Sequence, residues 1–281
     1  MSYIDKINDD LLSLIFNYLP IRDVYNLIKN FNISHELLNY HIINNILNKL
    51  KKIFNMDDYN QIINFMKNTN CHISGSFILG CILNKDYKTD IDFFISDRYI
   101  NDGNKLLELL KGRINNSNTY TKYEDEYDSF GCKLYIIDTY YNRNNLQFIF
   151  LKYEDPNENI VNNFDFDIIS NYLTYKNNKF ELYIDNIDNI INGFMKHKII
   201  RKNDNCAQME GRLIKYSKRG FKFDDVDDLH FIKKIISDSN TIYLCNIKND
   251  EMVDVSDLKG INIKNNQIIN MSYLRGMDIN C

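Results

Sequence analysis

The chain has 281 residues, of which 44% are hydrophobic and 26% are charged, as in ordinary globular proteins. Its formal net charge of −4 argues against broad electrostatic binding of long nucleic acids. The six cysteines form no Cys-x-x-Cys pair and no apolar run reaches about 18 residues. The sequence therefore predicts neither a zinc site nor a membrane span, and favours a cytoplasmic protein with reduced thiols.

Residues 7–31 predict a helical hairpin. Asp9 or Asp10 can cap a first helix that Pro20 ends, and a second helix is expected to start near Asp23. This stretch resembles the F-box, a helical module that binds the Skp adaptor of cullin ubiquitin ligases, which implies such an adaptor as a partner. An amphipathic hairpin packed on the following domain fits the pattern equally well.

The next segment, from His35 to Asn68, keeps apolar residues at helical spacing, with a short linker around residues 55–58. We expect a domain boundary at this linker, so that residues 1–55 form an F-box-like helical region. Lys49 and the two lysines that follow it fit a solvated helix end.

Two carboxylates inside an apolar strand mark the central stretch. Gly75-Ser76 is followed by a short apolar segment and then by Asp90 and Asp92, which alternate with Ile91 and Phe93. Alternate residues of a strand share a face, so the two acids are expected side by side. Like charges at that separation repel unless a cation lies between them, and Mg²⁺ prefers oxygen ligands. Surface acids after a Gly-Ser turn are the simpler alternative.

The spacing of Gly75-Ser76 and Asp90-Ile91-Asp92 resembles the signature of the DNA polymerase beta nucleotidyltransferase superfamily. The resemblance implies that Asp90 and Asp92 are catalytic and hold Mg²⁺ or Mn²⁺. It also implies that Gly75 and Ser76 contact the triphosphate of an NTP substrate. A glycine lets the backbone approach a phosphate closely, and the amides at a helix start bind anions.

A third acid often follows in that superfamily, on a strand of the hairpin type predicted for residues 133–140 and 146–153. Gln147 occupies the place where this acid would be sought, and Asp138 is the nearest acid on the partner strand. A neutral amide cannot supply the charge of a carboxylate. The sequence leaves open which of the two fills this position.

Residues 163–172 resemble the segment of tRNA CCA-adding enzymes that contacts the incoming nucleotide. The family's aspartate corresponds to Asp165, whereas its two arginines are replaced by Asn163 and Phe164. Alternatively, Asp165 caps a helix that starts at Phe166. A β-hairpin is predicted next, with its turn at residues 177–178.

The last hundred residues predict mainly helix up to about residue 238. Basic side chains fall on one broad helical face, namely Arg212, Lys215, Lys218, Arg219 and Lys222. This stretch resembles a helical segment of CCA-adding enzymes, which implies phosphate binding by Arg212, Lys215 and Arg219. A solvated basic face is the alternative.

Together these patterns predict an α+β protein with a nucleotidyltransferase-fold mixed sheet over residues 56–185. A mainly helical C-terminal domain is expected over residues 186–281. The combination resembles F-box and nucleotidyltransferase-like proteins of large DNA viruses. It implies a metal-dependent enzyme that transfers a nucleoside monophosphate from NTP to an RNA, protein or small-molecule acceptor. The alternative is a non-catalytic substrate adaptor for a cullin ubiquitin ligase, with the fold serving as a binding platform.

Overall fold

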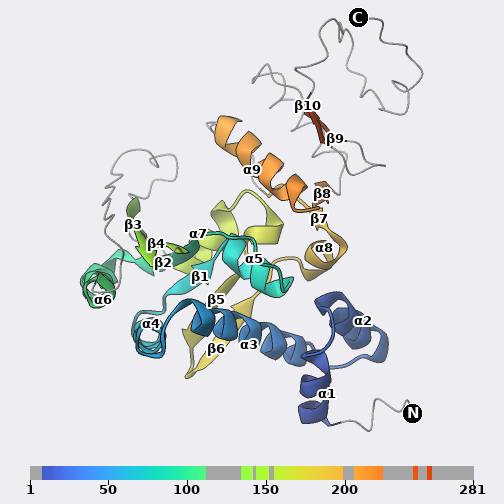
Figure 1. The fold of residues 1–281 in the computed structure, drawn as a ribbon, viewed down its shortest axis with the longest axis horizontal. Coiled ribbons are helices and arrows are strands. Elements are labelled where there is room, and N and C mark those ends of the chain that lie inside the picture. The colour runs from blue at the N-terminus through green and yellow to red at the C-terminus, as the bar shows by residue number, and fades with distance from the viewer. Residues whose placement is uncertain are drawn as a thin grey trace, which may run out of the picture. The chain divides into compact units, whose positions relative to one another are not determined.

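The computed structural model describes residues 8–111, 134–141, 144–151, 155–198, 206–223, 243–245 and 252–254. The chain divides into two compact units, residues 1–201 and residues 202–281. Figure 1 shows the elements of each unit in chain colours. The boundaries expected from the sequence at residues 55 and 185 stay predictions.

The predicted N-terminal hairpin is present as helices α1 (Asp9–Phe16) and α2 (Ile21–Phe31). The expected caps were wrong: Asn8 has extended backbone angles, and its side-chain oxygen accepts a hydrogen bond from the amide of Leu11 at 2.9 Å. Pro20 does not end α1, which stops at Phe16, but forms the N-cap of α2. Proline fits there because its fixed φ suits a helix start and no amide donor is lost from the helix.

Helix α2 is tied to helix α8 (Ile187–Asn192), far along the chain. The hydroxyl of Tyr25 donates to the Asp188 carboxylate at 2.6 Å, and the Arg22 guanidinium donates to the carbonyl oxygen of Ile191 at 2.8 Å. The hairpin is therefore packed on the rest of the first unit through α2, as one of the two sequence interpretations expected.

Helices α3 (His35–Ile53) and α4 (Met56–Thr69) follow, and the break between them lies at residues 54–55, slightly earlier than the linker expected around residues 55–58. The side chain of Asn55 caps α4 by accepting from the amide of Asp58 at 3.1 Å. The buried hydroxyl of Tyr141 also donates to the Asp58 carboxylate at 2.5 Å. This bond ties the start of α4 to the sheet. In Figure 1, α1 and α2 lie at one end of α3, and α4 and α6 (Ile100–Lys111) lie at the other.

A six-stranded mixed sheet forms the centre of the first unit, in the order β3-β4-β2-β1-β5-β6. Strands β2 and β4 are parallel, and every other neighbouring pair is antiparallel. The strands span β1 (His72–Ser74), β2 (Ile91–Ser96), β3 (Leu134–Tyr141), β4 (Asn144–Leu151), β5 (Tyr172–Lys176) and β6 (Lys179–Tyr183). The predicted α+β class and both predicted hairpins, β3-β4 and β5-β6, are confirmed.

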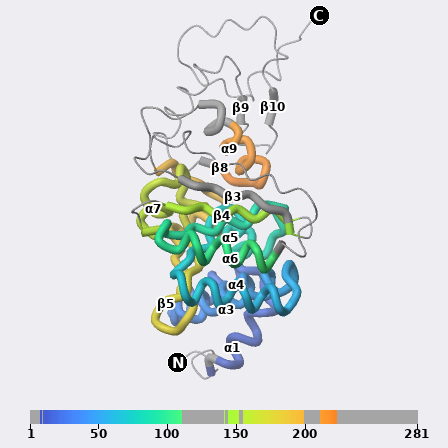
Figure 2. Tube along the Cα trace, turned by 90° about the vertical axis from the view of Figure 1, so that its left-hand side faces the viewer, coloured from blue at the N-terminus to red at the C-terminus, as the bar shows by residue number. Residues whose placement is uncertain are grey.

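Helices cover both faces of this sheet. On one face, α6 approaches β4 so closely that a Cβ on Gly103 would lie 2.5 Å from the Phe150 ring. On the other face, α7 (Pro156–Asn163) places Ile160 in a buried cluster with Phe94 and Ile149. In Figure 2, α7 lies above α6.

The second unit contains helix α9 (Cys206–Lys218) and strands β8 (Lys222–Phe223), β9 (Tyr243–Cys245) and β10 (Met252–Asp254). Gly220 ends the helical segment with a φ of 92°, and its amide donates to the carbonyl oxygen of Ser217 at 2.9 Å. The basic stretch predicted as one helical face is therefore broken. Arg219 lies in the turn and Lys222 lies in a strand, because glycine readily takes the left-handed conformation that stops the helix. Residues 224–238, also predicted to be helical, lie outside the described residues.

Candidate functional site

Gly75 links strand β1 to helix α5 (Ser76–Ile82) in a backbone conformation that L side chains rarely adopt, with φ 78° and ψ −153°. The glycine is also required for space. A Cβ added at this position would lie 2.6 Å from Oδ2 of Asp92. The two halves of the predicted motif, which are separated by more than a dozen residues in the sequence, therefore meet in the fold.

Strand pairing extends the site sideways from Asp92. On β1, Ser74 is the register partner of Asp92, and on β4 the partner is Gln147. On β3, Asp138 is in turn the partner of Gln147. Directly paired residues place their side chains on the same face of a sheet. Gln147 is thus the immediate neighbour of Asp92, and Asp138 is one strand further away.

Asp90 lies just outside the strand in which it was predicted, because β2 begins at Ile91. Asp90 is half-buried at the end of the segment 84–90 that connects α5 to β2. Because Asp90 is outside the strand, strand pairing does not place its side chain on the same face as that of Asp92. Metal binding by both acids together stays a prediction.

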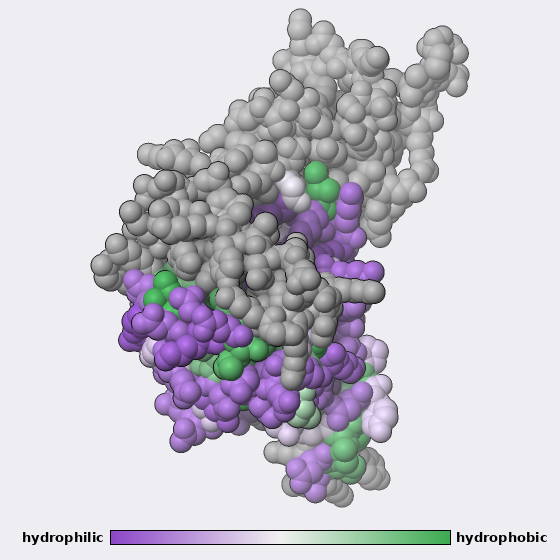
Figure 3. All heavy atoms as spheres, turned by 60° about the vertical axis from the view of Figure 1, so that its left-hand side comes forward, coloured by the Kyte–Doolittle hydropathy of each residue, from purple (hydrophilic) through white to green (hydrophobic). Residues whose placement is uncertain are grey.

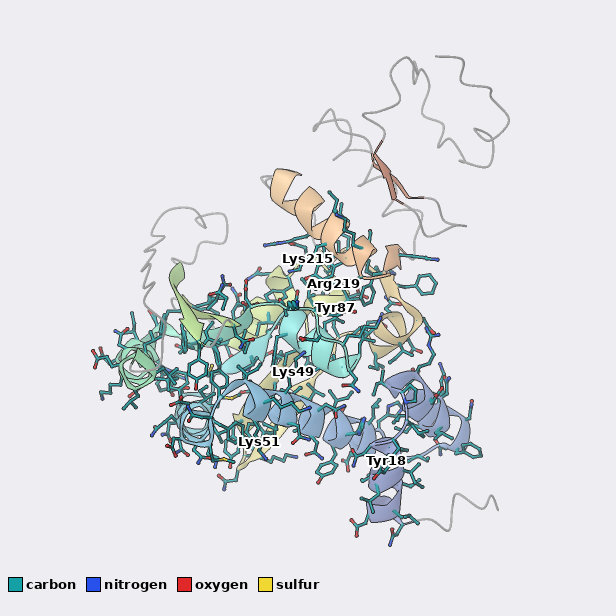
Figure 4. The ribbon with its side chains drawn as sticks, viewed as in Figure 1. Tyr18, Lys49, Lys51, Tyr87, Lys215 and Arg219 are labelled. Carbon is teal, nitrogen blue, oxygen red and sulfur yellow. The ribbon has the colours of Figure 1, made fainter. Side chains whose placement is uncertain are left out.

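The segment that leads to Asp90 is held against α3 and α5. The Lys49 ammonium lies 3.3 Å from the Asp86 carboxylate and donates to the carbonyl oxygen of Lys85 at 3.1 Å. The amide of Lys85 donates to the carbonyl oxygen of Gly80 at 2.8 Å, and a Cβ on Gly80 would lie 2.9 Å from the Lys85 oxygen. Figure 4 shows Lys49 on the side of α3 that faces α5.

Lys49 is thus more than the solvated helix end expected from the sequence. Its ammonium also lies 5.7 Å from the centre of the Phe77 ring. In the sequence, Lys49 stands out only as a basic residue in a helix rich in apolar residues. That pattern does not reveal its bond to the carbonyl oxygen of Lys85, which lies 36 residues further along the chain.

Ser76 is the first residue of α5 and is 5% exposed. All residues of this helix are buried. The adjacent Ser74 hydroxyl donates to the carbonyl oxygen of Asn171 at 2.6 Å, which fixes the end of β1 to the segment before β5. The Gly75-Ser76 turn is therefore held from both sides.

Asp165 is buried, and its backbone carbonyl oxygen accepts from the amide of Lys198 at 2.8 Å. The helix that Asp165 was expected to cap is a single 3₁₀ turn, Asp167–Ile169, with Phe166 at its N-cap and no side-chain cap bond. The capping interpretation was therefore wrong. The role of Asp165 in nucleotide binding stays a prediction.

Asp167, which the sequence interpretation did not single out, is the structural acid of this segment. Its Oδ1 accepts from the amides of Ile168 and Lys196, both at 2.8 Å, and its Oδ2 accepts from the Asn189 side chain at 2.6 Å. Burial raises the pKa of Asp167, and these hydrogen bonds counteract part of that rise. The carboxylate ties the 3₁₀ turn to α8, and this turn packs against α5.

The predicted phosphate-binding residues belong to the second unit. Arg212 and Lys215 lie on α9, three residues apart, and Arg219 lies in the following turn. The Arg219 guanidinium and the Lys215 ammonium lie 5.4 and 5.6 Å from the centre of the Tyr216 ring. That these basic residues bind the phosphates of a nucleotide held at Asp90 and Asp92 stays a prediction.

The donor set near Asp92 suits one hard cation. Within the described ranges, no group of three or more His, Cys, Asp and Glu side chains is placed to hold a metal ion. Asp90, Asp92 and the amide oxygen of Gln147 are oxygen ligands of the type that Mg²⁺ prefers. The missing Cβ of Gly75 leaves room beside Oδ2 of Asp92. These residues fit a single divalent cation better than a pair.

A sequence model of the Gabija anti-defense 2 family (Gad2) matches residues 41–192, more than half of the chain. The chain belongs to this family. The part matched by the Gad2 model contains the whole six-stranded sheet, Gly75, Asp90 and Asp92. It contains neither the α1–α2 hairpin nor α9.

A search of curated proteins finds no match. Among solved structures, the CCA-adding enzyme of Thermotoga maritima complexed with tRNA is similar, with 12% sequence identity and a TM-score of 0.47. The similarity covers 67% of the Gad2-family chain and 44% of that enzyme, so the chain spans less than half of its length. In the helices that the structure describes, none is long and apolar enough to cross a membrane.

Proposed function

We propose that this chain is a metal-dependent nucleotidyltransferase that moves a nucleoside monophosphate from an NTP to an acceptor. The observation that carries the proposal is the close approach of Gly75 to the Asp92 carboxylate. A glycine turn directly beside a carboxylate lets the backbone amides reach a phosphate while the acid holds the cation bound to that phosphate.

In this proposal, Asp90 and Asp92 hold Mg²⁺ or Mn²⁺, and the amide oxygen of Gln147 contributes a neutral ligand. Mg²⁺, when bound there, would offset the charge of the triphosphate and polarise the reacting phosphate. Asp92 is fixed by the β1-β2-β4 pairing, whereas Asp90 depends on the segment that Lys49 holds. Lys49 is therefore a positioning residue for Asp90.

The triphosphate would lie at the Gly75-Ser76 turn, with Asp165 toward the nucleoside. Arg212, Lys215 and Arg219 would add positive charge, since the strand itself offers only negative charge. A guanidinium can bind phosphate oxygens through two parallel hydrogen bonds, so Arg212 and Arg219 are the better candidates.

The family name, anti-defense, favours an acceptor that belongs to a defence system. Protein, RNA and small-molecule acceptors all remain within the proposal, and the net charge of −4 favours a short or compact acceptor over long nucleic acid.

The direct test is incubation of the purified protein with each α-labelled NTP and Mg²⁺ or Mn²⁺, in the presence of RNA and candidate proteins. Label should appear on one acceptor with the parent and disappear with Asp92→Asn. Asp102→Asn, on the exposed side of α6, removes the same charge and is the control. Equal labelling by Asp92→Asn and the parent would overturn the proposal.

A binding readout separates the metal site from catalysis. Gln147→Glu adds a carboxylate beside Asp92 and should tighten Mn²⁺ binding in calorimetry. The control is Gln61→Glu, which adds the same charge to the exposed surface of α4. If both variants bind Mn²⁺ as the parent does, Gln147 does not lie at the metal.

A substrate-adaptor function is the second candidate, and the surface of α1 favours it. Leu11 and Leu14 on α1 and Tyr18, in the turn that follows this helix, are 48, 58 and 88% exposed. Figure 3 shows hydrophobic atoms among polar ones on the surface at the α1 end of the first unit, and Figure 4 places Tyr18 at the hairpin, away from the sheet. Because α2 already packs on α8, α1 is the helix available to a Skp-type adaptor.

Purified Skp adaptor should bind the parent and not the double variant Leu14→Ser with Tyr18→Ser. Apolar anchors commonly contribute most of the energy of such interfaces. Tyr40→Ser, at an exposed position of α3, is the matched control. No binding to the parent would leave the hairpin as a packing element of the first unit.

A further inference from the structure

A cavity of about 730 Å³ lies at the other end of the sheet face that carries Asp92. It is bordered by the end of β2, the start of β1, the β5-β6 hairpin and the residues that open α7. Asp92 and Ser96, at the two ends of β2, are about 13 Å apart at the usual rise per residue of a strand. The buried cluster under α7, with Phe94, Ile149 and Ile160, belongs to the same face. The cavity is therefore separate from the proposed metal site.

The side chains that decide the chemistry of the cavity are one histidine, two tyrosines and three acids. These are His72, Tyr172, Tyr183, Asp97, Asp155 and Glu181. Its volume is within the range of small-molecule sites, about 300–1,000 Å³.

His72 lies in the wall of the cavity and is only 5% exposed. Its ring packs edge-on against Tyr172, with 4.7 Å between the ring centres. Burial lowers its pKa to about 4, so the ring is neutral at pH 7. Nδ1 is buried and has no hydrogen-bond partner among the described residues. With the proton on Nε2, Nδ1 is a lone-pair acceptor that only an added donor can satisfy.

The aromatic wall is rigid and offers no free donor. Tyr172 and Tyr183 stack with 5.1 Å between ring centres and 16° between ring planes. The Tyr172 hydroxyl donates to Oδ1 of Asn157, and the Tyr183 hydroxyl donates to Oδ1 of Asp185, both at 3.1 Å. Both tyrosine protons are therefore engaged in bonds within the protein.

Two basic side chains, Arg98 and Lys176, also line the cavity. The Arg98 guanidinium lies over the Tyr99 ring, 4.7 Å from its centre, and Arg98, Lys176 and Asp155 are all exposed. Three acids against two bases leave the lining with one excess negative charge beside its aromatic surface. That combination binds ammonium groups, through charge-assisted hydrogen bonds and through the faces of the rings.

We propose that this cavity binds a small organic cation with protonated amine groups, of the polyamine class. One ammonium would donate to the carboxylates of Asp155 and Glu181, and an N–H would satisfy Nδ1 of His72. The methylene chain of such a cation would lie along the tyrosine rings. This site does not depend on the proposed transferase activity.

Spermidine is the probe, added to the full chain in calorimetry at about physiological salt, where exposed charges are screened over roughly 8 Å. Asp155→Asn together with Glu181→Gln should weaken binding about tenfold or more, since charged hydrogen bonds are lost. Asparagine is as good an N-cap as aspartate, so the start of α7 is preserved. Glu158→Gln, on the exposed side of α7, is the control and should bind as the parent does.

His72→Phe keeps an aromatic ring against Tyr172 and removes the acceptor, so it should weaken spermidine binding while the thermal unfolding profile at pH 7 stays cooperative. Spermidine that binds the Asp155/Glu181 double variant as tightly as it binds Glu158→Gln would overturn the proposal. So would a parent that binds inorganic phosphate, in competition with spermidine or in its place, because Arg98 and Lys176 would then determine the ligand. No spermidine binding by the parent would also overturn it.

Discussion

Two neighbouring rows of residues cross the central sheet, one on each face. In each strand from β6 to β4, one row has an apolar side chain where the other has a polar side chain or a tyrosine. The apolar row consists of Leu182, Leu173, Ile73, Phe93 and Phe148, and the polar row consists of Tyr183, Tyr172, Ser74, Asp92 and Gln147. On β3 the register continues to Ile137 and Asp138. A shift of one position along each strand thus separates the core from the candidate chemistry.

The apolar row shows what packing alone requires. Phe93 and Phe148 are fully buried and stack with 4.9 Å between ring centres and 8° between planes. The polar row belongs to the same strands. At one end, its residues Tyr172 and Tyr183 line the cavity, and further along, its Asp92 carboxylate lies beside Gly75. Asp92 and Gln147 are only half-buried, whereas Phe93 and Phe148 are fully buried, so these polar positions can be mutated at lower energetic cost.

The largest effect is expected in the apolar row. Phe148→Ala should lower the free energy of unfolding by about 3–5 kcal/mol, because a fully buried ring is replaced by a cavity. Gln147→Ala, one position away on the opposite face, should lower it by less than about 1 kcal/mol. Urea unfolding of both variants makes the comparison. Equal effects would show that the two rows do not differ in their structural role.

The second effect concerns His72, which shares the polar face and pairs in register with Phe94. Burial lowers the pKa of His72 from 6.5 to about 4, so between these values the unfolded chain binds a proton that the folded chain does not. The free energy of unfolding should therefore fall as the pH drops from 6.5 to 4, by at most about 1.4 kcal/mol per pH unit.

Urea unfolding across this pH range checks the prediction. His72→Gln removes the titrating ring and should flatten the pH dependence by the corresponding amount. The same slope in the parent and in His72→Gln would show that His72 is accessible to protons in the folded state.

Most of the alternation between these rows could be predicted from the sequence. The pattern of Ile91, Asp92 and Phe93 places the carboxylate opposite the apolar residues, and the fold confirms this. The resemblance likewise implied a helix start at Gly75-Ser76, and α5 begins at Ser76. Local periodicity carries such information because side-chain direction is fixed by the strand itself.

Contacts between distant segments were not predictable. Nothing near Lys49 indicates that it would hold the segment before Asp90, and nothing near Asp167 indicates its bonds to Lys196 and Asn189. The start of β2 also differs by one residue from the expectation, which removes Asp90 from the ladder. Such details depend on tertiary packing, which a local pattern does not encode.

Gly75→Ala should give the third effect, on the polar side of the comparison. The backbone angles at Gly75 are those that only glycine adopts readily, and strain of this kind amounts to about 1–3 kcal/mol. The added methyl group would also press on Oδ2 of Asp92. Thermal unfolding should show the loss, and Mn²⁺ binding should weaken with it. Gly211→Ala, on α9 with no heavy atom near its added Cβ, is the control and should be neutral or slightly stabilising. A neutral Gly75→Ala would show that the glycine turn relaxes away from Asp92.

The smallest effect on the metal-free protein is expected for Asp92→Asn, because Asp92 is proposed to bind metal rather than to stabilise the fold. The substitution keeps the shape of the side chain and removes one of two neighbouring acids, so the free energy of unfolding should rise slightly, by less than about 1 kcal/mol. Metal should reverse the order of the two proteins. At a tenfold excess over its dissociation constant, Mg²⁺ should stabilise the parent by about 1.4 kcal/mol, and it should leave Asp92→Asn unchanged. Asp102→Asn should follow the parent in both conditions. Thermal unfolding with and without Mg²⁺ measures all three proteins. A variant that gains as much from Mg²⁺ as the parent would place the cation elsewhere and leave Asp92 as a surface acid on a well-packed strand.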